Sequence, residues 1–364
     1  MMSEVYFSNL SGKHKSWLDR TSKLFDRAKF ASLIEPGDIV AIKVHFGERG
    51  NTAFLSPLFV RRVVDKVKAA GGKPFVTDAN TLYVGARSNA VDHLITAIEN
   101  GFSYATVGAP LIIADGINGK DYITVGIDGK HVKEAKIGSA VYHADAVIAL
   151  THFKGHELTG FGGALKNIGM GLGSRSGKQV MHSDVLPSIE EEKCTSCGKC
   201  IKWCPAEAIT VSSTAAIDAS RCLGCGECTV TCSFEAIAVN WKTEPDLIQE
   251  KIVEYTWAVI KDKPDKVGYF NFITNVSPDC DCCGWNDTPI VPDIGILASF
   301  DPIAIDQACV DLVNRTEGLP GSRLSAINDD DKFRTVTGID WRPQLAYGEK
   351  IGLGKRNYTL VEVK

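Results

Sequence analysis

Two runs of four cysteines constrain this chain more than any other feature of its sequence. Both runs read C-x2-C-x2-C-x3-C, and the stretches CTSCGKCIKWCPAEAITV and CLGCGECTVTCSFEAIAV align without a gap. The segment that contains them is therefore an internal repeat. The chain has twelve cysteines in all. In a cytoplasmic protein, which we expect this to be, so many cysteines point to metal or redox sites, because the cytosol keeps thiols reduced.

The spacing is that of bacterial two-cluster ferredoxins, in which three thiolates hold one [4Fe–4S] cluster and the fourth reaches across to the other. It predicts two [4Fe–4S] clusters with crossed ligation. Tetrahedral zinc also uses C-x2-C pairs, but it leaves the last two cysteines of each run unexplained. Ser233 departs from the ferredoxin pattern, which often has a proline there. The expected ligands are Cys194, Cys197, Cys200 and Cys232 for one cluster, and Cys222, Cys225, Cys228 and Cys204 for the other.

Outside the repeat, apolar stretches alternate with helical patterns. This alternation predicts an α/β fold, with a mostly parallel sheet covered by helices on both faces. The repeat interrupts it as a small ferredoxin-like α+β domain, so we expect domain segments at 1–188, 189–241 and 242–364. The expected strands are 5–10, 38–47, 73–80, 144–153, 267–276 and 293–300, with strand-like stretches at 105–115 and 122–128; the expected helices are 17–33, 56–71, 88–100, 247–261 and 302–314.

The overall balance of residues excludes several partners. The formal net charge is −4, whereas binding to nucleic acid usually needs a basic surface. The N-terminal stretch has no apolar run typical of a signal peptide, and no window approaches the roughly 18 apolar residues of a membrane span. We expect a soluble, cytoplasmic protein that binds neither nucleic acid nor membrane.

Polar residues follow two of the expected strands, with His45 near the end of one and His152 near the end of another. Open α/β sheets bind ligands at the carboxyl ends of their strands. Eight glycines between 155 and 177 predict a loop with exposed N–H groups, and basic neighbours make it a candidate anion site. Taken singly, each residue fits an ordinary surface role. The candidate catalytic residues are His45, His152, Lys154, His156 and Lys166, and the candidate binding residues are Lys43, Arg49, Asn167, Arg175 and Lys178.

No Walker A or G-x-G-x-x-G fingerprint stands in its proper context, so ATP and NAD have no positive support. Four other segments carry a more specific signal: KVHFGERGN, DANTLYVGARSNAVDH, THFKGHELTGFGGALKNIGMG and DIGILASFDPIAIDQACVDL. They resemble the DUF362 family, whose members are often described as iron–sulfur centre proteins with a ferredoxin domain. The resemblance implies the inserted-ferredoxin layout, but it implies no particular reaction.

The stretch PDCDCCGWND, residues 278–287, holds three further cysteines. In extended backbone Cys280 and Cys282 face one way and Cys283 the other. The two thiols could form a metal or substrate site, a redox-active pair, or buried apolar filling. Pro278 and Gly284 predict an exposed turn. We expect Cys280 and Cys282 to act near His45, His152 or Lys166, with an additional metal as one interpretation, because all these segments follow strands of one sheet.

The favoured interpretation is a reductase-like oxidoreductase. Two clusters would pass electrons from an external carrier or redox partner protein to a small anionic or metal-bound substrate on the α/β domain. The alternative is a non-enzymatic electron-transfer or metallocentre-assembly protein, whose basic loop docks a partner. A pocket enclosed beneath the glycine-rich segment would favour the enzyme, and a flat exposed CDCC stretch the accessory protein.

Overall fold

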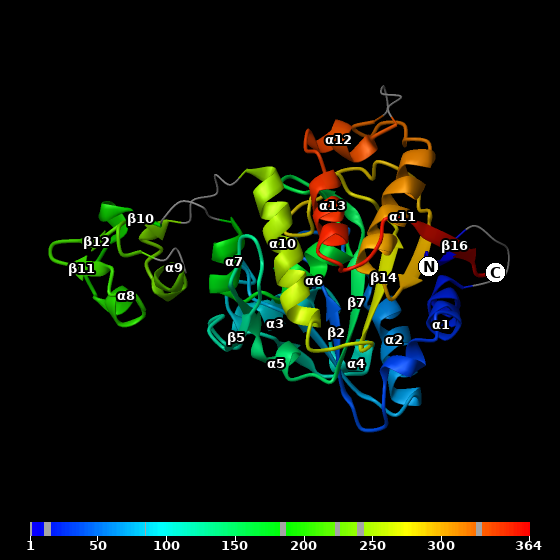
Figure 1. Ribbon diagram of the computed structural model, residues 1–364, viewed down its shortest axis with the longest axis horizontal. Coiled ribbons are helices and arrows are strands. Elements are labelled where there is room, and N and C mark those ends of the chain that lie inside the picture. The colour runs from blue at the N-terminus through cyan, green and yellow to red at the C-terminus, as the bar shows by residue number, and fades with distance from the viewer. Residues whose placement is uncertain are drawn as a thin grey trace.

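The computed structural model describes residues 2–10, 16–83, 85–182, 187–222, 226–238, 244–324 and 330–364. An eight-stranded sheet forms the centre of the molecule (Figure 1). In spatial order its strands are β16 (Tyr358–Glu362), β1 (Ser3–Asn9), β15 (Gly295–Ser299), β14 (Val267–Ile273), β7 (Ala146–His152), β2 (Ile39–Val44), β3 (Lys73–Asp78) and β4 (Leu111–Ile113).

The sheet is mostly parallel, as predicted. β2 pairs in parallel with β3 and β7, and β7 in turn pairs in parallel with β14, so the carboxyl ends of these four strands share one edge. β15 runs antiparallel to both of its neighbours, β1 and β14. Within the ladder Ile42 lies opposite Ile148, and Phe270 lies opposite Leu150. The central strands are buried on both faces, which explains why they are almost continuously apolar in sequence.

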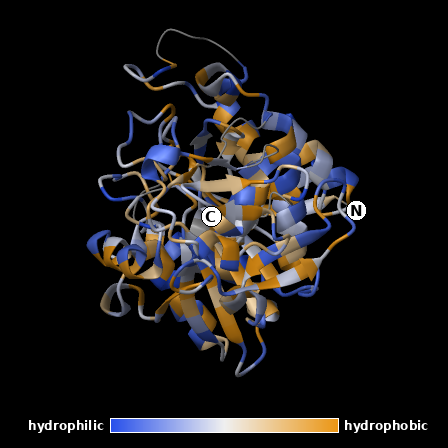
Figure 2. Cartoon of the chain, turned by 90° about the vertical axis from the view of Figure 1, so that its left-hand side faces the viewer, coloured by the Kyte–Doolittle hydropathy of each residue, from blue (hydrophilic) through white to orange (hydrophobic). Residues whose placement is uncertain are grey.

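Alternate residues of each strand enter two hydrophobic cores, one on each face of the sheet. In β2, Val40 and Ile42 join one core and Ala41 the other. The first face is covered by helices that precede the insert and the second mainly by helices around and after it, which confirms the prediction of helices on both faces (Figures 1 and 2). The covering helices are α1 (Trp17–Arg27) and α2 (Pro57–Ala69) on one side, and α6 (Ala164–Leu172), α10 (Pro245–Ile260) and α11 (Pro302–Arg315) on the other.

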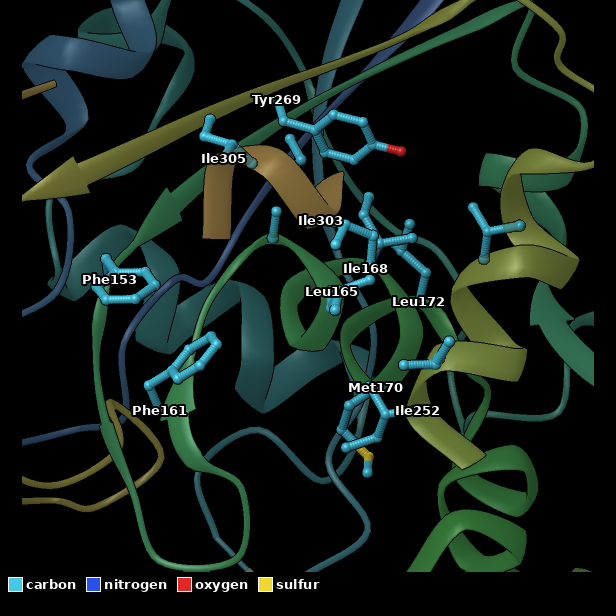
Figure 3. Packing of buried hydrophobic residues seen from close by; sticks show 14 of the residues in the cluster. Phe153, Phe161, Leu165, Ile168, Met170, Leu172, Ile252, Tyr269, Ile303 and Ile305 are labelled. Carbon is cyan, nitrogen blue, oxygen red and sulfur yellow. The ribbon is translucent and has the colours of Figure 1, made fainter. Parts of the chain in front are cut away.

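α6 lies in the part of the chain that the sequence suggested was a glycine-rich loop. Figure 3 shows Leu165 and Ile168 of this helix close to Ile252 of α10 and Ile303 of α11. Glycine here serves helix packing: a Cβ built on Gly169 would lie 2.1 Å from the carbonyl oxygen of Ile252. The loop interpretation is therefore wrong for this stretch, because its glycines let two helices approach closely.

Two predicted helix starts are confirmed by their caps. Ser56 accepts a hydrogen bond from the N–H of Leu58, and Asp301 accepts from the N–H groups of Ile303 and Ala304.

None of the helices in the described ranges is long and apolar enough to cross a membrane. The other elements of the α/β part are η1 (Phe30–Leu33), α3 (Ala90–Glu99), α4 (Tyr104–Val107), β5 (Tyr122–Gly126), β6 (Glu134–Gly138), α5 (Ser139–Tyr142), β8 (Lys154–His156), β9 (Gly160–Gly162), α7 (Arg175–His182), α12 (Lys332–Thr337) and α13 (Arg342–Lys350).

Two strand-like stretches differ from expectation. The segment 105–115 begins inside helix α4 and becomes a strand only at β4. The segment 122–128 does form strand β5, but β5 pairs with β6 in a separate antiparallel hairpin instead of joining the large sheet. Both stretches carry β-branched residues, whose preference for strands does not say which sheet they join.

The cysteine-rich segment forms a small α+β unit at one side of the molecule, next to α7 (Figure 1). β10 pairs with β13, and β11 with β12, both antiparallel. The sequence repeat is also structural: Gly198 and Gly226 occupy matching positions, precede the two short helices, and have φ angles of 68° and 70°. The elements are β10 (Ser188–Ile189), η2 (Glu191–Lys193), α8 (Lys199–Lys202), β11 (Ile209–Val211), β12 (Ala215–Ile217), α9 (Glu227–Thr231) and β13 (Ile237–Ala238).

Candidate functional site

A cavity of about 270 Å³ lies at the carboxyl edge of the parallel strands, next to α6. This is the edge where open α/β sheets bind their ligands. Its volume suits a small molecule. Cationic side chains outnumber anionic ones in its lining, which contains Lys43, Arg87, Lys154, Lys166 and Lys178 against Asp78 and Glu157.

Lys43 is fully buried in this lining. Its Nζ atom lies 3.0 Å from Oδ1 of Asp78 and donates a hydrogen bond of 2.8 Å to Oδ1 of Asn167. Arg87 also approaches Asp78, at 3.4 Å. Burial opposes the ionisation of Asp78, but the charge of Lys43 outweighs it and holds the pKa of this carboxyl well below its usual range.

His45, just after β2, contacts Cys282, the second cysteine of the CDCC stretch. Its Nε2 atom lies 3.4 Å from Sγ of Cys282, and its Nδ1 atom accepts a hydrogen bond from the N–H of Gly47 at 3.0 Å. Burial and the charge of Arg87 lower the pKa of His45 to about 4. The ring is therefore neutral near pH 7 and carries its proton on Nε2, where it donates to Cys282.

Lys166, on α6, contacts Cys280, the first cysteine of the CDCC stretch. Its Nζ atom donates to Sγ of Cys280 at 3.4 Å. A hydrogen bond from Cys282 and the charge of Lys166 lower the pKa of Cys280 to about 6, although burial acts in the opposite direction. The pKa of Cys282 is raised, first by its hydrogen bond to Cys280. At neutral pH Cys280 is thus the thiolate and Cys282 the thiol that donates to it.

The backbone of the CDCC stretch forms a turn that is buried at its start. The N–H of Cys283 donates to the carbonyl oxygen of Cys280 at 3.0 Å. Cys280 is only 1% exposed and Asp281 is fully buried, whereas Gly284 is exposed. The expectation of extended backbone is wrong here, and the expected exposed turn is found only at its Gly284 end.

Asp281 holds the turn in place. Its carboxylate lies 2.9 Å from Nδ1 of His152 and 3.2 Å from Nζ of Lys154. Burial opposes ionisation, but these two neighbours hold the pKa of Asp281 far below its usual range. The other nitrogen of His152 faces the carbonyl oxygens of Thr274 and Asn275. With both ring nitrogens engaged, His152 anchors the turn and does not line the cavity.

The structure brings together most of the predicted site residues. The expected proximity of Cys280 and Cys282 to His45 and Lys166 is confirmed by the two contacts of 3.4 Å. Two predicted binding residues lie elsewhere. Arg49 is exposed and pairs with Glu99, and Arg175 donates to the carbonyl oxygen of Leu82, outside the cavity. The predicted residues that line the cavity are Lys43, His45, Lys154, His156, Lys166, Asn167, Lys178 and Cys282.

Several lining residues were missed from the sequence. Arg87 is 1% exposed and reaches the hydroxyl of Tyr83 at 2.5 Å. The same hydroxyl donates to Glu48 at 2.9 Å and to the carbonyl oxygen of Cys282 at 3.3 Å. The signal was present, because these residues follow strand β3 within one of the segments quoted for the family resemblance. The missed lining residues include Asp78, Tyr83, Arg87, Glu157 and His182.

Several of the described thiols of the insert lie near one another. Cys204, Cys222 and Cys228 line one small cavity, and Cys197 and Cys232 both act electrostatically on Cys200. Backbone N–H groups reach three of the sulfurs, as suits thiolates in iron–sulfur sites. The donor and acceptor pairs are Ala208 to Cys204 (3.2 Å), Ala215 to Cys194 (3.3 Å) and Ala236 to Cys232 (3.3 Å).

The fit to a cluster is therefore reasonable in donor type and arrangement. Cys225, the remaining predicted ligand, lies outside the described residues. Within the described ranges, no three His, Cys, Asp or Glu side chains stand close enough to share a single metal ion. Two [4Fe–4S] clusters in this insert therefore stay a prediction.

The insert docks on the β5–β6 hairpin through a buried carboxylate. Glu227 accepts from the hydroxyl of Tyr122 at 2.6 Å and pairs with Lys136 at 2.8 Å. Beside this contact, a second cavity lies between the two parts of the chain, with Cys232 on one side and Leu82 and Tyr83 on the other. These last two residues also line the first cavity. Leu82 and Tyr83 thus form a wall common to the two cavities, and the second cavity lies between this wall and Cys232.

The fold and the cavity together define an α/β protein with a ligand site at the carboxyl edge of its parallel strands and a cysteine-rich insert beside it. The comparison with family models identifies the domain of unknown function DUF362 over residues 40–311. The chain belongs to the DUF362 family. No curated protein matches its sequence.

Two solved structures share distant similarity with the chain. One is the lactate racemase apoprotein from Thermoanaerobacterium thermosaccharolyticum, with 13% identity and a TM-score of 0.38 over 75% of this chain. The other is a structural-genomics protein from Thermotoga maritima, with 12% identity and a TM-score of 0.39 over 72% of this chain. The chain spans about half the length of each, 51% and 52%. Similarity this distant says nothing about activity.

Proposed function

We propose that this chain is an iron–sulfur reductase that holds two [4Fe–4S] clusters in its insert and reduces a small anionic substrate in the basic cavity. When bound, such clusters supply electrons one at a time. The observation that carries the proposal is that the two cavities have two lining residues in common. Leu82 and Tyr83 line both the cavity that contains Cys232 and the cavity that contains Cys282. A donor site and a substrate site on either side of a common wall suit a reductase.

The charges of the cavity support an anionic substrate. Lys43 and Lys154 are each paired with a buried carboxylate, whereas Lys178 donates to the carbonyl oxygen of Gly173. A backbone carbonyl only partly satisfies an ammonium group, so the charge of Lys178 remains for a ligand. In a buried site such a charge acts more strongly than in water.

The burial of the CDCC turn favours an enzyme over an accessory protein. A non-enzymatic electron-transfer or metallocentre-assembly protein would present its thiols to a partner at the surface. Cys280 is instead 1% exposed, and the cavity lies beside Gly162 and Gly163 at the start of α6. The external partner is then an electron carrier or a redox partner protein, and the many reduced thiols suit a cytoplasmic location.

Anaerobic purification with metal and sulfide analysis tests the clusters. The proposal expects about eight irons and eight acid-labile sulfides per chain, from two cubanes. Stoichiometric zinc without labile sulfide would contradict it.

The substrate site is tested by reoxidation of the dithionite-reduced protein with a panel of small anionic electron acceptors. Lys178→Met should slow reoxidation by the effective acceptors, because it removes a cation from the cavity. Arg49→Gln is the matched control, since Arg49 is exposed and pairs with Glu99 outside the cavity. Equal slowing in both variants, or in neither, would contradict a substrate site in this cavity.

A further inference from the structure

The arrangement of the CDCC turn assigns a more specific role to two of its thiols. We propose that Cys280 and Cys282 form a reversible dithiol–disulfide pair, which reduces small anionic disulfides in the cavity. For its supply of electrons this inference rests on the function proposed above. The pair itself can be tested without the clusters.

Each sulfur of the pair has its own polar partner. Nζ of Lys166 lies 3.4 Å from Sγ of Cys280, and Nε2 of His45 lies 3.4 Å from Sγ of Cys282. A cation beside one sulfur and a neutral N–H beside the other stabilise one thiolate and one thiol. This asymmetry gives the pair an internal base: the Cys280 thiolate can accept the proton of Cys282, which converts Cys282 to the thiolate form that attacks a disulfide.

The backbone geometry allows the two sulfurs to bond. In an extended strand, Cα atoms two residues apart lie about 6.6 Å from each other, near the upper limit for a disulfide. The turn closed by the hydrogen bond from Cys283 to Cys280 shortens that separation. The two sulfurs contact Lys166 and His45, which both line the same cavity, so both sulfurs lie on the cavity side of the turn.

The positions of the two thiols relative to the cavity indicate which of them attacks the substrate first. Cys282 lines the cavity, whereas Cys280 lies behind it at 1% exposure. Cys282 attacks one sulfur of a disulfide RS–SR while its proton passes to the Cys280 thiolate. A bond forms between Cys282 and one RS group, and the other RS group leaves as a thiolate. The lysines of the cavity stabilise this anion.

Cys280 then resolves the mixed disulfide. It gives its proton to the departed thiolate, and its own thiolate, held by Lys166, attacks Sγ of Cys282. The sum is one RS–SR plus one thiolate and one thiol of the protein, giving the Cys280–Cys282 disulfide, one RS⁻ and one RSH. Two electrons from an external one-electron carrier and one proton restore the pair.

Peptide mapping tests whether the pair forms. No lysine or arginine lies within residues 267–314, so one tryptic peptide, 267–315, holds the CDCC thiols and Cys309, apart from the eight ferredoxin-type cysteines. After mild oxidation with diamide, this peptide should lose two alkylation sites. A second protease that cuts before aspartate separates Cys280 from Cys282 at Asp281, and the disulfide should still join the two fragments.

Two outcomes of the mapping would overturn the pair. One is full alkylation of both Cys280 and Cys282 after oxidation. The other is a bond from Cys282 to Cys283, which leaves Cys280 on a separate fragment. Cys283→Ser should retain the disulfide, whereas Cys282→Ser should abolish it. These results do not depend on iron or sulfide content, so failure here is distinguishable from failure of the cluster proposal.

The class of substrate is tested with two small disulfides of opposite charge. Dithiodiglycolate is a dianion and cystamine a dication of similar length. With the reduced protein, dithiodiglycolate should oxidise the pair at least about tenfold faster than cystamine, because a cationic cavity concentrates anions. Lys166→Met should reduce this preference and slow the reaction. Equal rates for the two disulfides, or a faster reaction with cystamine, would overturn the assignment of an anionic substrate.

Discussion

Nδ1 of His152 lies 2.9 Å from the carboxylate of Asp281, and this contact ties the CDCC turn to the end of β7. Lys154 completes the arrangement at 3.2 Å from the same carboxylate. All three side chains are buried. The turn that carries Cys280 and Cys282 is thus fixed by an ion pair inside the protein, at the strand end that positions the cavity.

Asp281→Ala should strongly destabilise the protein. The change leaves the charge of Lys154 buried without its carboxylate, and breaking a buried pair typically costs about 3–5 kcal/mol. Urea unfolding followed by tryptophan fluorescence measures the loss. Asp279→Ala is the matched control two residues earlier, because Asp279 pairs with the partly exposed Arg323. The control should cost at most about 1 kcal/mol, and similar losses in both variants would contradict the anchoring role of Asp281.

The same carboxylate gives a pH dependence. The folded pKa of Asp281 is depressed, so its stabilising contribution is complete well above the unfolded pKa of about 3.9. That contribution falls as the pH drops below this value toward the folded pKa. Stability of the wild type should therefore decline more steeply between pH 5 and 3, on the order of 1 kcal/mol or more, than that of Asp281→Asn. Parallel curves would contradict the prediction.

Gly155→Ala should displace the CDCC turn without removing any side chain from the site. A Cβ at Gly155 would lie 2.0 Å from the carbonyl oxygen of Pro278, so the backbone that leads to Cys280 has to move. We expect a loss of about 1–3 kcal/mol and slower oxidation of the thiol pair. Gly126→Ala is the control, since its Cβ would meet no atom within 4 Å. Unchanged thiol reactivity in Gly155→Ala would show that the turn tolerates the shift.

Cys204→Ala should damage the cluster assigned to Cys222, Cys225 and Cys228. The reason is that the fourth cysteine of each run ligates the other cluster, and Cys204 lines one cavity with Cys222 and Cys228. Iron analysis and electron paramagnetic resonance of the reduced variant measure the loss. Cys232→Ala should affect the other cluster. Loss of the cluster on Cys194, Cys197 and Cys200 in the Cys204 variant would refute the crossed pairing.

Anion binding in the cavity should weaken as the pH rises through about 8. Burial lowers the pKa of Lys178 to about 8, although Asp115 and Asp78 act in the opposite direction and Lys43 and Arg87 assist burial. Below this pH the ammonium form attracts anions, and above it the neutral amine does not. Calorimetric titration with sulfate should show affinity falling about tenfold per pH unit above 8, if the charged form is required.

Two variants test whether the loss of sulfate affinity near pH 8 is caused by the titration of Lys178. Lys178→Met should remove it and leave a weaker, flatter affinity profile. Lys133→Met should behave as wild type, because Lys133 is largely exposed and pairs with Asp128 away from the cavity. A step near pH 8 that survives in Lys178→Met would assign the titration to another group.

The regular parts of the fold could be predicted because they depend on local spacing. The continuous apolar run of 38–47 marked the buried strand β2, and the capping residues Ser56 and Asp301 marked helix starts. The glycine-rich segment misled the prediction. Glycine permits both a loop and close helix packing, and only the nearby backbone of Ile252 decides between them at Gly169.

The location of the candidate site could be predicted from the sequence, but the side chains that line it could not. Topology alone places the strand ends that carry His45 and His152 at one edge. It does not say that His152 turns to Asp281 while His45 faces the cavity, or that Arg49 points to solvent. Arg87 enters the site because its charge is balanced there by Asp78 and Glu48, residues from other segments.

The sequence by itself determined the internal repeat, the spacing of its eight cysteines and the alternation that makes an α/β sheet. These features are set by residues a few positions apart, so they can be recognised from one chain. Only the tertiary structure decided which thiol lies beside which charge. Cys280 and Lys166 are 114 positions apart, and Cys282 and His45 are 237 apart. Their ionisation depends on burial and on the low dielectric of the packed interior, which come only from the folded arrangement.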